Sequence, residues 1–265
     1  GAAVAAKLIL GGVPPLWATL AAVVAGAVAG CFTGLLHTKG NINGLLAGIL
    51  TMIALYSVNL RIMGKANLPL LREETLITPL QDGGYLGSWL SIVILSVVAL
   101  ALKLFIDWLM HTEIGLSIQA TGDNPEMIRS FGVDTDQTKI LGLSISNGLV
   151  GLCGALIAQY QGFADIGMGI GLILVGLASV IIGQVLFGSR SILASTFAVI
   201  LGSIVYRIVL TLSLEIGFNP SDMKLISAAL VILALILPQW SVFRRLPRFK
   251  VAKSVRSEAA RGEDR

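Results

Sequence analysis

Polar side chains occur inside long apolar stretches of the sequence, where an amide, hydroxyl or guanidinium group is costly, and we single out six of them. They are Ser57, Asn59, Asn147, Ser179, Gln184 and Arg207. A polar group at membrane depth is costly, and it usually faces the interior of a helix bundle or a water-filled path. These residues are therefore candidates for contacts with a small solute that crosses a membrane. Each also has a structural interpretation, because hydroxyls and amides bond to helix backbones and Arg207 can extend toward a membrane surface.

The sequence offers little for covalent or metal chemistry. His37 and His111 lie at the ends of apolar stretches, and Cys31 and Cys153 are far apart. A zinc site needs several such ligands at short spacing, and a nucleophile needs a neighbouring base. Neither pattern occurs in the sequence. This disfavours an enzyme that acts within the membrane and predicts that the chain itself holds no metal or cofactor.

The composition is that of a membrane protein. Hydrophobic residues make up 55% of the 265 residues and charged residues 13%, whereas soluble domains carry about a quarter charged residues. A bilayer core ~30 Å thick needs about 20 apolar residues per helix. We expect an all-α, polytopic bundle with about eight visible spans and one more before residue 1, because the chain starts inside a short apolar run. The stretches cover residues 1–10, 16–36, 44–63, 86–110, 138–158, 167–187, 192–214 and 223–240.

Small residues recur every three or four positions in two of these stretches. One set is Gly26, Gly30 and Gly34, and the other is Gly148, Gly151 and Ala155. In lipid, small side chains let helix backbones approach closely, and packing rather than hydrophobicity holds the helices together. The spacing predicts tight contacts between helices.

Basic residues set the expected orientation. Residues 244–265 contain eight Lys and Arg residues against three acids, and cytoplasmic segments carry the basic excess. Loops 37–43, 111–137 and 188–191 then face the cytoplasm, and loops 64–85, 159–166 and 215–222 face outward. We predict a membrane domain over 1–243 and a basic cytoplasmic tail over 244–265. The tail suits anionic lipid headgroups better than nucleic acid, because it lacks a basic face with interleaved aromatic residues.

The predicted loop 111–137 contains a short helix with both ends marked. Asp123 or Asn124, which follow Gly122, can cap its first N–H groups. Pro125 suits the first helical position, and Glu126 complements the positive end of the helix dipole. Gly132 is the expected residue just after the last turn.

This short helix is amphipathic. Met127, Ile128 and Phe131 form an apolar face about two turns long, while Arg129 is polar. Such a helix can dock into a groove of a soluble partner, or it can lie on the bilayer surface. The residues alone leave both interpretations open.

Two segments resemble the branched-chain amino acid/ribose permease family of ABC importers. The first is the run ATGDNPEMIRSFGVD at 120–134, followed by Lys139 and the glycine-rich run GLVGLCGAL at 148–156. The second is GLILVGLASVIIGQVLFG at 171–188. The chain departs from the family at NGLLAGILTMI (43–53), where Ala-Thr-Leu-Gly is common, and at Gln184, where a second glycine is common. These departures resemble a branch whose binding proteins are linked to aromatic amino acids.

The resemblance implies that the chain is a permease in the bacterial inner membrane that works with several partner proteins. These are a second permease copy, two cytoplasmic ATP-binding subunits and an external solute-binding protein or lipoprotein. The sequence contains no Gly-x-x-x-x-Gly-Lys-Ser/Thr phosphate loop, so ATP and Mg²⁺ are expected in the ATPase subunits. Residues 122–132 would then be the coupling helix, which docks on the ATPase and transmits its motion.

A secondary transporter driven by an ion gradient is the alternative. Such a protein would need a carboxylate near the membrane midplane. The acid placed deepest in an apolar stretch is Asp107, which lies near the predicted inner end. It is four residues from Lys103, so a local ion pair is expected.

Overall fold

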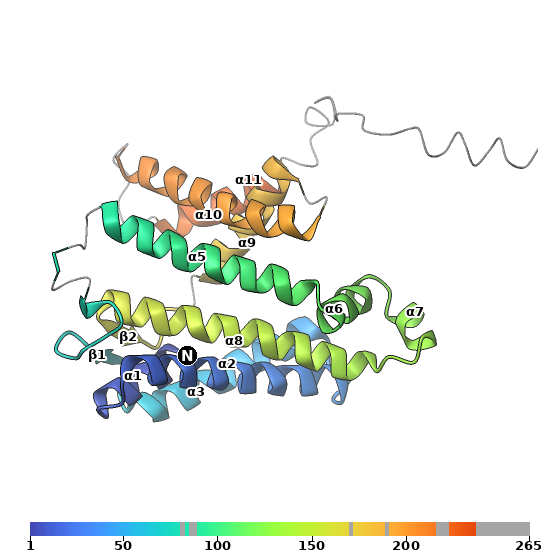
Figure 1. Ribbon diagram of the computed structural model, residues 1–265, viewed down its shortest axis with the longest axis horizontal. Coiled ribbons are helices and arrows are strands. Elements are labelled where there is room, and N and C mark those ends of the chain that lie inside the picture. The colour runs from blue at the N-terminus through green and yellow to red at the C-terminus, as the bar shows by residue number, and fades with distance from the viewer. Residues whose placement is uncertain (80–82, 85–88, 170–171, 189–190, 216–222, 237–265) are drawn as a thin grey trace, which may run out of the picture. The chain divides into compact units, whose positions relative to one another are not determined.

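The computed structural model describes residues 1–79, 83–84, 89–169, 172–188, 191–215 and 223–236, which divide into units Gly1–Leu172 and Ile173–Arg265. The first unit contains α1 (Ala2–Leu10), α2 (Pro15–Thr38), α3 (Gly44–Met63), β1 (Asn67–Pro69), α5 (Trp89–Met110), α6 (Glu113–Asp123), α7 (Pro125–Ser130), α8 (Thr135–Gln161) and β2 (Phe163–Asp165). At the boundary α9 (Leu172–Phe187) begins, and α10 (Ile192–Glu215) and α11 (Met223–Ile236) complete the second unit (Figure 1).

Five described helices are long and apolar enough to cross a membrane. They are Pro15–Thr38, Gly44–Met63, Ile92–Met110, Thr135–Gln161 and Ile192–Glu215. Each overlaps a stretch predicted from the sequence, which confirms the polytopic helical architecture.

The other three predicted spans are shorter helices in the described part of the chain. α1 has 9 residues, α9 has 16 and α11 has 14. At 1.5 Å per residue, α1 rises only about 14 Å, roughly half the thickness of a bilayer core. The count of eight spans therefore stays a prediction. Residues 237–240 of the last stretch, and the basic tail at 244–265, lie outside the described residues.

α2 and α8 pack closely along their small residues. A Cβ atom on Gly34 would lie 2.8 Å from the Cα atom of Ile140, and one on Gly151 would lie 2.6 Å from the carbonyl oxygen of Ala22. Only a glycine hydrogen fits at such distances, so the predicted tight contact is confirmed. Residues later in α2 contact residues earlier in α8, so the two helices are antiparallel.

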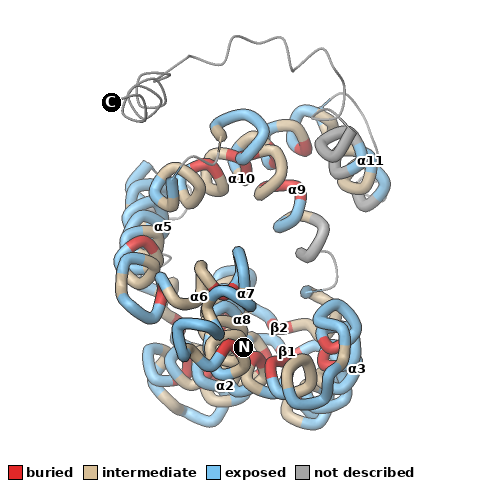
Figure 2. The backbone as a smooth tube through the Cα atoms, turned by 90° about the vertical axis from the view of Figure 1, so that its right-hand side faces the viewer, coloured by how far each residue is buried: buried red, intermediate tan, exposed pale blue. Residues whose placement is uncertain are grey.

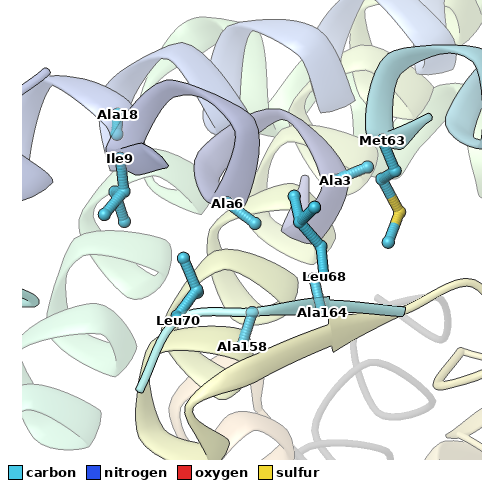
Figure 3. Packing of buried hydrophobic residues seen from close by; sticks show 9 residues of the cluster. All are labelled: Ala3, Ala6, Ile9, Ala18, Met63, Leu68, Leu70, Ala158 and Ala164. Atoms are coloured by element: carbon cyan, nitrogen blue, oxygen red, sulfur yellow. The ribbon is translucent and has the colours of Figure 1, made fainter. Parts of the chain in front are cut away.

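A core of buried apolar side chains lies where α1, α2, α3, α8 and the two strands meet (Figure 3). Its members are Ala3, Ala6, Ile9, Ala18, Met63, Leu68, Leu70, Ala158 and Ala164. The strands are antiparallel, with Leu68 opposite Ala164. This pairing joins loops 64–85 and 159–166, which the sequence places on the same side of the membrane. The two short strands add a feature that the all-α expectation did not include.

α3 and α5 are exposed along most of their length (Figure 2). On α3 the buried residues are Ala47, Thr51 and Met63. Among the described side chains of α5, only Asp107 is buried. It forms the predicted ion pair with Lys103, with 2.5 Å between the ammonium and carboxylate groups. Exposed apolar helix faces of this kind suit contact with lipid or with another membrane helix.

One buried amide connects three parts of the first unit. Gln159 of α8 is 2% exposed. Its Nε2 group donates to Oγ1 of Thr19 on α2 at 2.9 Å, and its Oε1 atom accepts from the backbone N–H of Leu76 at 3.0 Å. The side chain therefore fixes the segment that follows β1 onto the α2–α8 pair.

Gln159→Leu should lower the stability of this end of the unit. Leu76 N–H loses its acceptor and Thr19 Oγ1 loses its donor, and an unsatisfied buried polar group costs about 1–3 kcal/mol. We expect a lower unfolding temperature in detergent and faster proteolysis between residues 70 and 79. Gln161→Leu is the matched control, because Gln161 is exposed two positions later. Equal shifts for both variants would contradict the role given to Gln159.

Candidate functional site

The loop between α5 and α8 is folded into two consecutive helices, α6 and α7 (Figure 1). Thr112 caps α6 by accepting a hydrogen bond from Gly115 N–H at 3.3 Å, and Glu113 lies in its first turn. Of these two helices, only α7 was predicted from the sequence. A threonine followed by an acid is a helix-start signal that could have revealed α6.

The predicted short helix is present as α7. Asn124 is its cap, since the side-chain oxygen accepts from the N–H of Met127 at 3.0 Å. Pro125 occupies the first position, and Gly132 follows the helix with a φ of +84°, a backbone conformation that suits glycine. Of the two candidate caps, Asp123 is instead the last residue of α6. The predicted helix boundaries are therefore confirmed.

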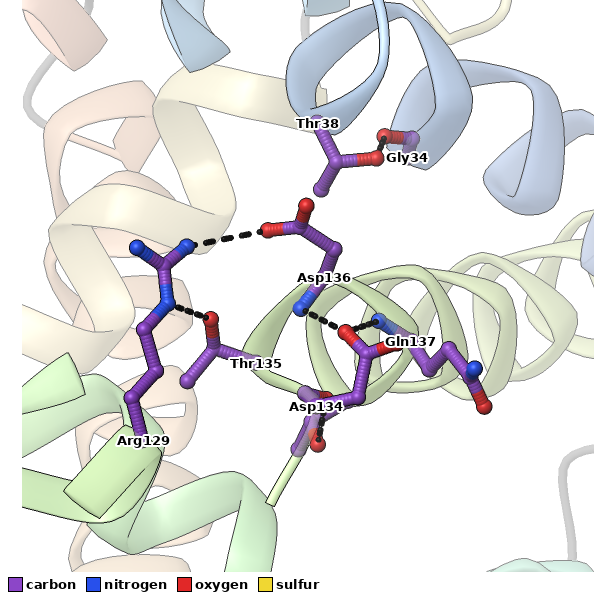
Figure 4. Close-up of polar contacts among 8 residues, drawn as sticks. Gly34, Thr38, Arg129, Asp134, Thr135, Asp136 and Gln137 are labelled. Carbon is purple, nitrogen blue, oxygen red and sulfur yellow. Dashed lines mark hydrogen bonds and ion pairs between the residues drawn. The ribbon is translucent and has the colours of Figure 1, made fainter. Parts of the chain in front are cut away.

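Arg129 ties α7 to the start of α8 (Figure 4). Its Nε group donates to Oγ1 of Thr135 at 2.7 Å, and Nη2 lies 3.4 Å from Oδ1 of Asp136. Thr135 is 1% exposed, so one end of this tie is rigidly packed. Arg129 therefore connects α7 directly to the first turn of α8.

Asp134 caps α8. Its Oδ1 atom accepts from the N–H groups of Asp136 at 2.9 Å and Gln137 at 3.2 Å. The hydrogen bonds from the backbone of Gln137 and Asp136 lower the pKa of the Asp134 carboxyl below its ordinary value. The cap is therefore ionised at neutral pH, and its contribution is lost only as the pH falls through this lowered pKa.

The outward side of α7 is apolar. Phe131 is 74% exposed and Met127 is 47% exposed, while Ile128 is partly buried. Phe131 and Met127 are four residues apart, so they lie on the same side of the helix. An exposed aromatic ring beside a methionine, on a helix held by polar bonds, is a surface suited to a groove in a partner protein.

The six polar candidates for a solute path are not gathered in one place. In the first unit, Ser57 is exposed and Asn59 partly buried on α3. Asn147 lies at the α2–α8 contact, where its Nδ2 group donates to the carbonyl oxygen of Leu143 at 2.9 Å.

The other three belong to the second unit. Ser179 is 4% exposed, lies in the contact between α9 and α10, and donates to the carbonyl oxygen of Val175 at 2.8 Å. Gln184 on α9 and Arg207 on α10 are exposed. Asn147 and Ser179 thus already bond to their own helices, whereas Arg207 presents its charge on a helix surface.

Potential metal ligands are dispersed in the described residues. No group of three or more His, Cys, Asp or Glu side chains there could hold a metal ion. His37 contacts the carbonyl oxygen of Ile42 through Nδ1 at 2.8 Å, and His111 contacts that of Asp107 at 2.6 Å. Both imidazoles thus bond to the chain at helix ends.

Residues 1–236 match the family described as branched-chain amino acid transport system, permease component. The chain belongs to this permease family. It is a membrane component of an ABC-type transport system and not an enzyme. The family assignment agrees with the resemblance seen in the sequence.

Relatives of this permease carry several names. The tyrosine transport system permease protein of Clostridioides difficile (strain R20291) is 41% identical over 88% of this chain and 76% of its own length. Uncharacterized protein RP368 of Rickettsia prowazekii (strain Madrid E) is 38% identical over 89% of this chain and 82% of its own length. The permease LsrC of the autoinducer 2 import system of Yersinia pseudotuberculosis (strain IP 31758) is 29% identical over 72% of this chain and 52% of its own. No solved structure matches the permease.

Proposed function

We propose that this permease imports an aromatic amino acid and that two cytoplasmic ATPase subunits drive it through α7. The solute class is supported by the 41% identical relative that is named a tyrosine transport permease. The observation that carries the ATPase contact is the exposed pair Met127 and Phe131, placed on a helix that Arg129 fixes to α8.

The contacts give a mechanical route for the coupling. An ATPase subunit holds the apolar side of α7 in a groove, and its closure on ATP displaces that helix. The Arg129–Thr135 hydrogen bond carries the displacement into α8. Because α8 packs on α2 backbone to backbone, the two helices move together rather than sliding. ATP and Mg²⁺ act in the ATPase subunits.

The orientation predicted from the basic residues assigns the other parts of the transporter to the two sides of the membrane. The α6–α7 end and the tail at 244–265 lie in the cytoplasm of a bacterium, with the tail on the inner membrane surface. The β1–β2 end faces outward and receives a solute-binding protein or lipoprotein. The permease works as a dimer with a second copy, for which the exposed faces of α3 and α5 provide apolar surface.

The test is uptake of labelled L-tyrosine into proteoliposomes that contain the permease, its ATPase subunits and its binding protein. ATP-dependent uptake that disappears when the ATPase is omitted supports the proposal. Uptake that follows a proton or sodium gradient without any ATPase would instead establish a secondary transporter. ATP-driven uptake of other solutes but not of aromatic amino acids would refute the proposed solute class.

A further inference from the structure

Arg207 belongs to a polar stripe on α10, a helix that is otherwise rich in apolar side chains. Ser203, Arg207 and Thr211 follow one another at intervals of four residues, so they share one side of the helix. Ser203 Oγ donates to the carbonyl oxygen of Ile200 at 2.7 Å, and Thr211 Oγ1 donates to that of Arg207 at 3.0 Å. Both hydroxyl oxygens keep lone pairs that can accept a hydrogen bond.

Arg207 itself is placed deep along the helix. The residue is eight positions before Glu215, the last residue of α10, and therefore about 12 Å from that end. The 24 residues of α10 rise about 36 Å, only slightly more than a ~30 Å hydrocarbon core. A guanidinium at such depth requires a polar partner or water.

The packing of the second unit fixes which way the stripe faces. Ala198, Gly202, Tyr206 and Leu210 form the buried side of α10. The Tyr206 hydroxyl donates to Ser227 Oγ on α11 at 2.8 Å, which anchors that side. Arg207 is the next residue, about 100° further round the helix, and its side chain is exposed. The charge is therefore held outside the helix contacts.

The stripe borders an open groove with a volume of about 390 Å³, lined by Ser203, Ile204, Arg207, Ile208, Thr211 and Leu212. All six lining residues belong to α10, and sites for small molecules combine apolar walls with a few polar groups. Among the residues that the structure describes, no acid forms an ion pair with Arg207. The groove thus has one unneutralised cation, two hydroxyl acceptors and apolar walls.

We propose that Arg207 binds the α-carboxylate of the translocated amino acid, and that Ser203 and Thr211 accept from its ammonium group. This inference rests on the proposed function, because it takes the solute to be an amino acid. A guanidinium recognises a carboxylate with two parallel N–H···O bonds, which gives orientation as well as affinity. The isoleucine and leucine side chains of the groove then contact the solute's side chain. The phosphate of a lipid headgroup is the competing anion, but the depth of Arg207 places it away from the headgroups.

The experiment measures protection of a cysteine placed beside Arg207. Cys31 and Cys153 are replaced by alanine, and Ile204→Cys is introduced about one turn before Arg207, where the exposed side chain lines the groove and Arg207, Ser203 and Thr211 are kept. Maleimide labelling is then followed in nanodiscs of zwitterionic or anionic lipid. We expect L-tyrosine to slow labelling, 3-(4-hydroxyphenyl)propionate to protect more weakly, and tyramine, which lacks the carboxylate, to give no protection. Arg207→Gln should weaken tyrosine protection by roughly tenfold to a hundredfold, and Arg207→Lys by less. Leu193→Cys, at the start of α10, is the unprotected control.

Several results would overturn the assignment. Tyramine protecting as well as tyrosine, or protection unchanged in Arg207→Gln, would show that the carboxylate is bound elsewhere. Labelling that responds to anionic lipid and not to tyrosine would assign Arg207 to a lipid phosphate. Tyrosine uptake is measured on the complete transporter in parallel. If uptake occurs in the wild type but Arg207→Gln leaves it and the labelling unchanged, this inference fails while the proposed function stands.

Discussion

Replacing Gly30 with alanine is expected to prevent α2 and α8 from packing and to leave little folded permease in the membrane. A Cβ atom at this position would overlap the carbonyl oxygen of Leu143 and lie 2.8 Å from the Cβ atom of Asn147. A backbone carbonyl cannot turn away as a side chain can, so the two helices must separate. Overpacking typically lowers the free energy of unfolding by about 1–3 kcal/mol. Because the helices are rigid, separating them at Gly30 also weakens the neighbouring glycine contacts and increases the loss.

The measurement is the yield of monodisperse protein after detergent extraction, together with its unfolding temperature. Gly48→Ala is the matched control, because nothing lies within 4 Å of a Cβ atom at that position of α3. There the same change should be neutral or stabilising by up to about 1 kcal/mol, the gain in helix propensity. If Gly30→Ala and Gly48→Ala behave alike, the close α2–α8 contact is not formed in the membrane.

Phe131→Asp should abolish ATP-driven uptake without unfolding the permease. The ring is 74% exposed and contributes little to the core, but in the proposed complex it is buried in the ATPase. A carboxylate left unpaired in such an interface costs about 3–5 kcal/mol, a loss of at least a hundredfold in affinity. The ATPase subunits should therefore no longer co-purify with the variant.

Leu71→Asp provides the control for this second prediction. Leu71 is 82% exposed and follows β1, at the opposite end of the first unit from α7. The same kind of change there should leave ATPase binding intact. If the ATPase subunits still co-purify with Phe131→Asp and uptake still depends on ATP, the ATPase binds another surface of the permease.

Local sequence patterns were sufficient to predict the long helices and α7. The bounds of α3, Gly44–Met63, agree with the apolar stretch at 44–63. Asn124, Pro125 and Gly132 mark the ends of α7, because caps and chain reversals depend on a few adjacent residues. Such signals act over one or two turns and need no knowledge of the rest of the fold. The family resemblance likewise rested on contiguous runs.

Contacts between residues far apart in the sequence could not be predicted from these local patterns. Asn67 and Asp165 pair across 98 positions, and Gln159 bonds to Thr19 across 140. A strand of three residues has no periodicity to detect, and the sequence near Gln159 contains no sign of its partners. The Gln159–Thr19 link exists because antiparallel packing brings the end of α8 beside the start of α2, and the Asn67–Asp165 link exists because β1 pairs with β2.

The polar residues of the spans illustrate the same division. The sequence singles out Asn147, Ser179 and Arg207, because each interrupts an apolar run. Packing then separates them, since Asn147 and Ser179 bond to carbonyls of their own helices at helix contacts, and Arg207 is turned outward beside Tyr206. The length of an apolar stretch and the cap of a helix depend on residues that are adjacent in the sequence, so the sequence alone determines them. Whether a polar group is already satisfied depends on which helix lies against it, and only the folded arrangement supplies that neighbour.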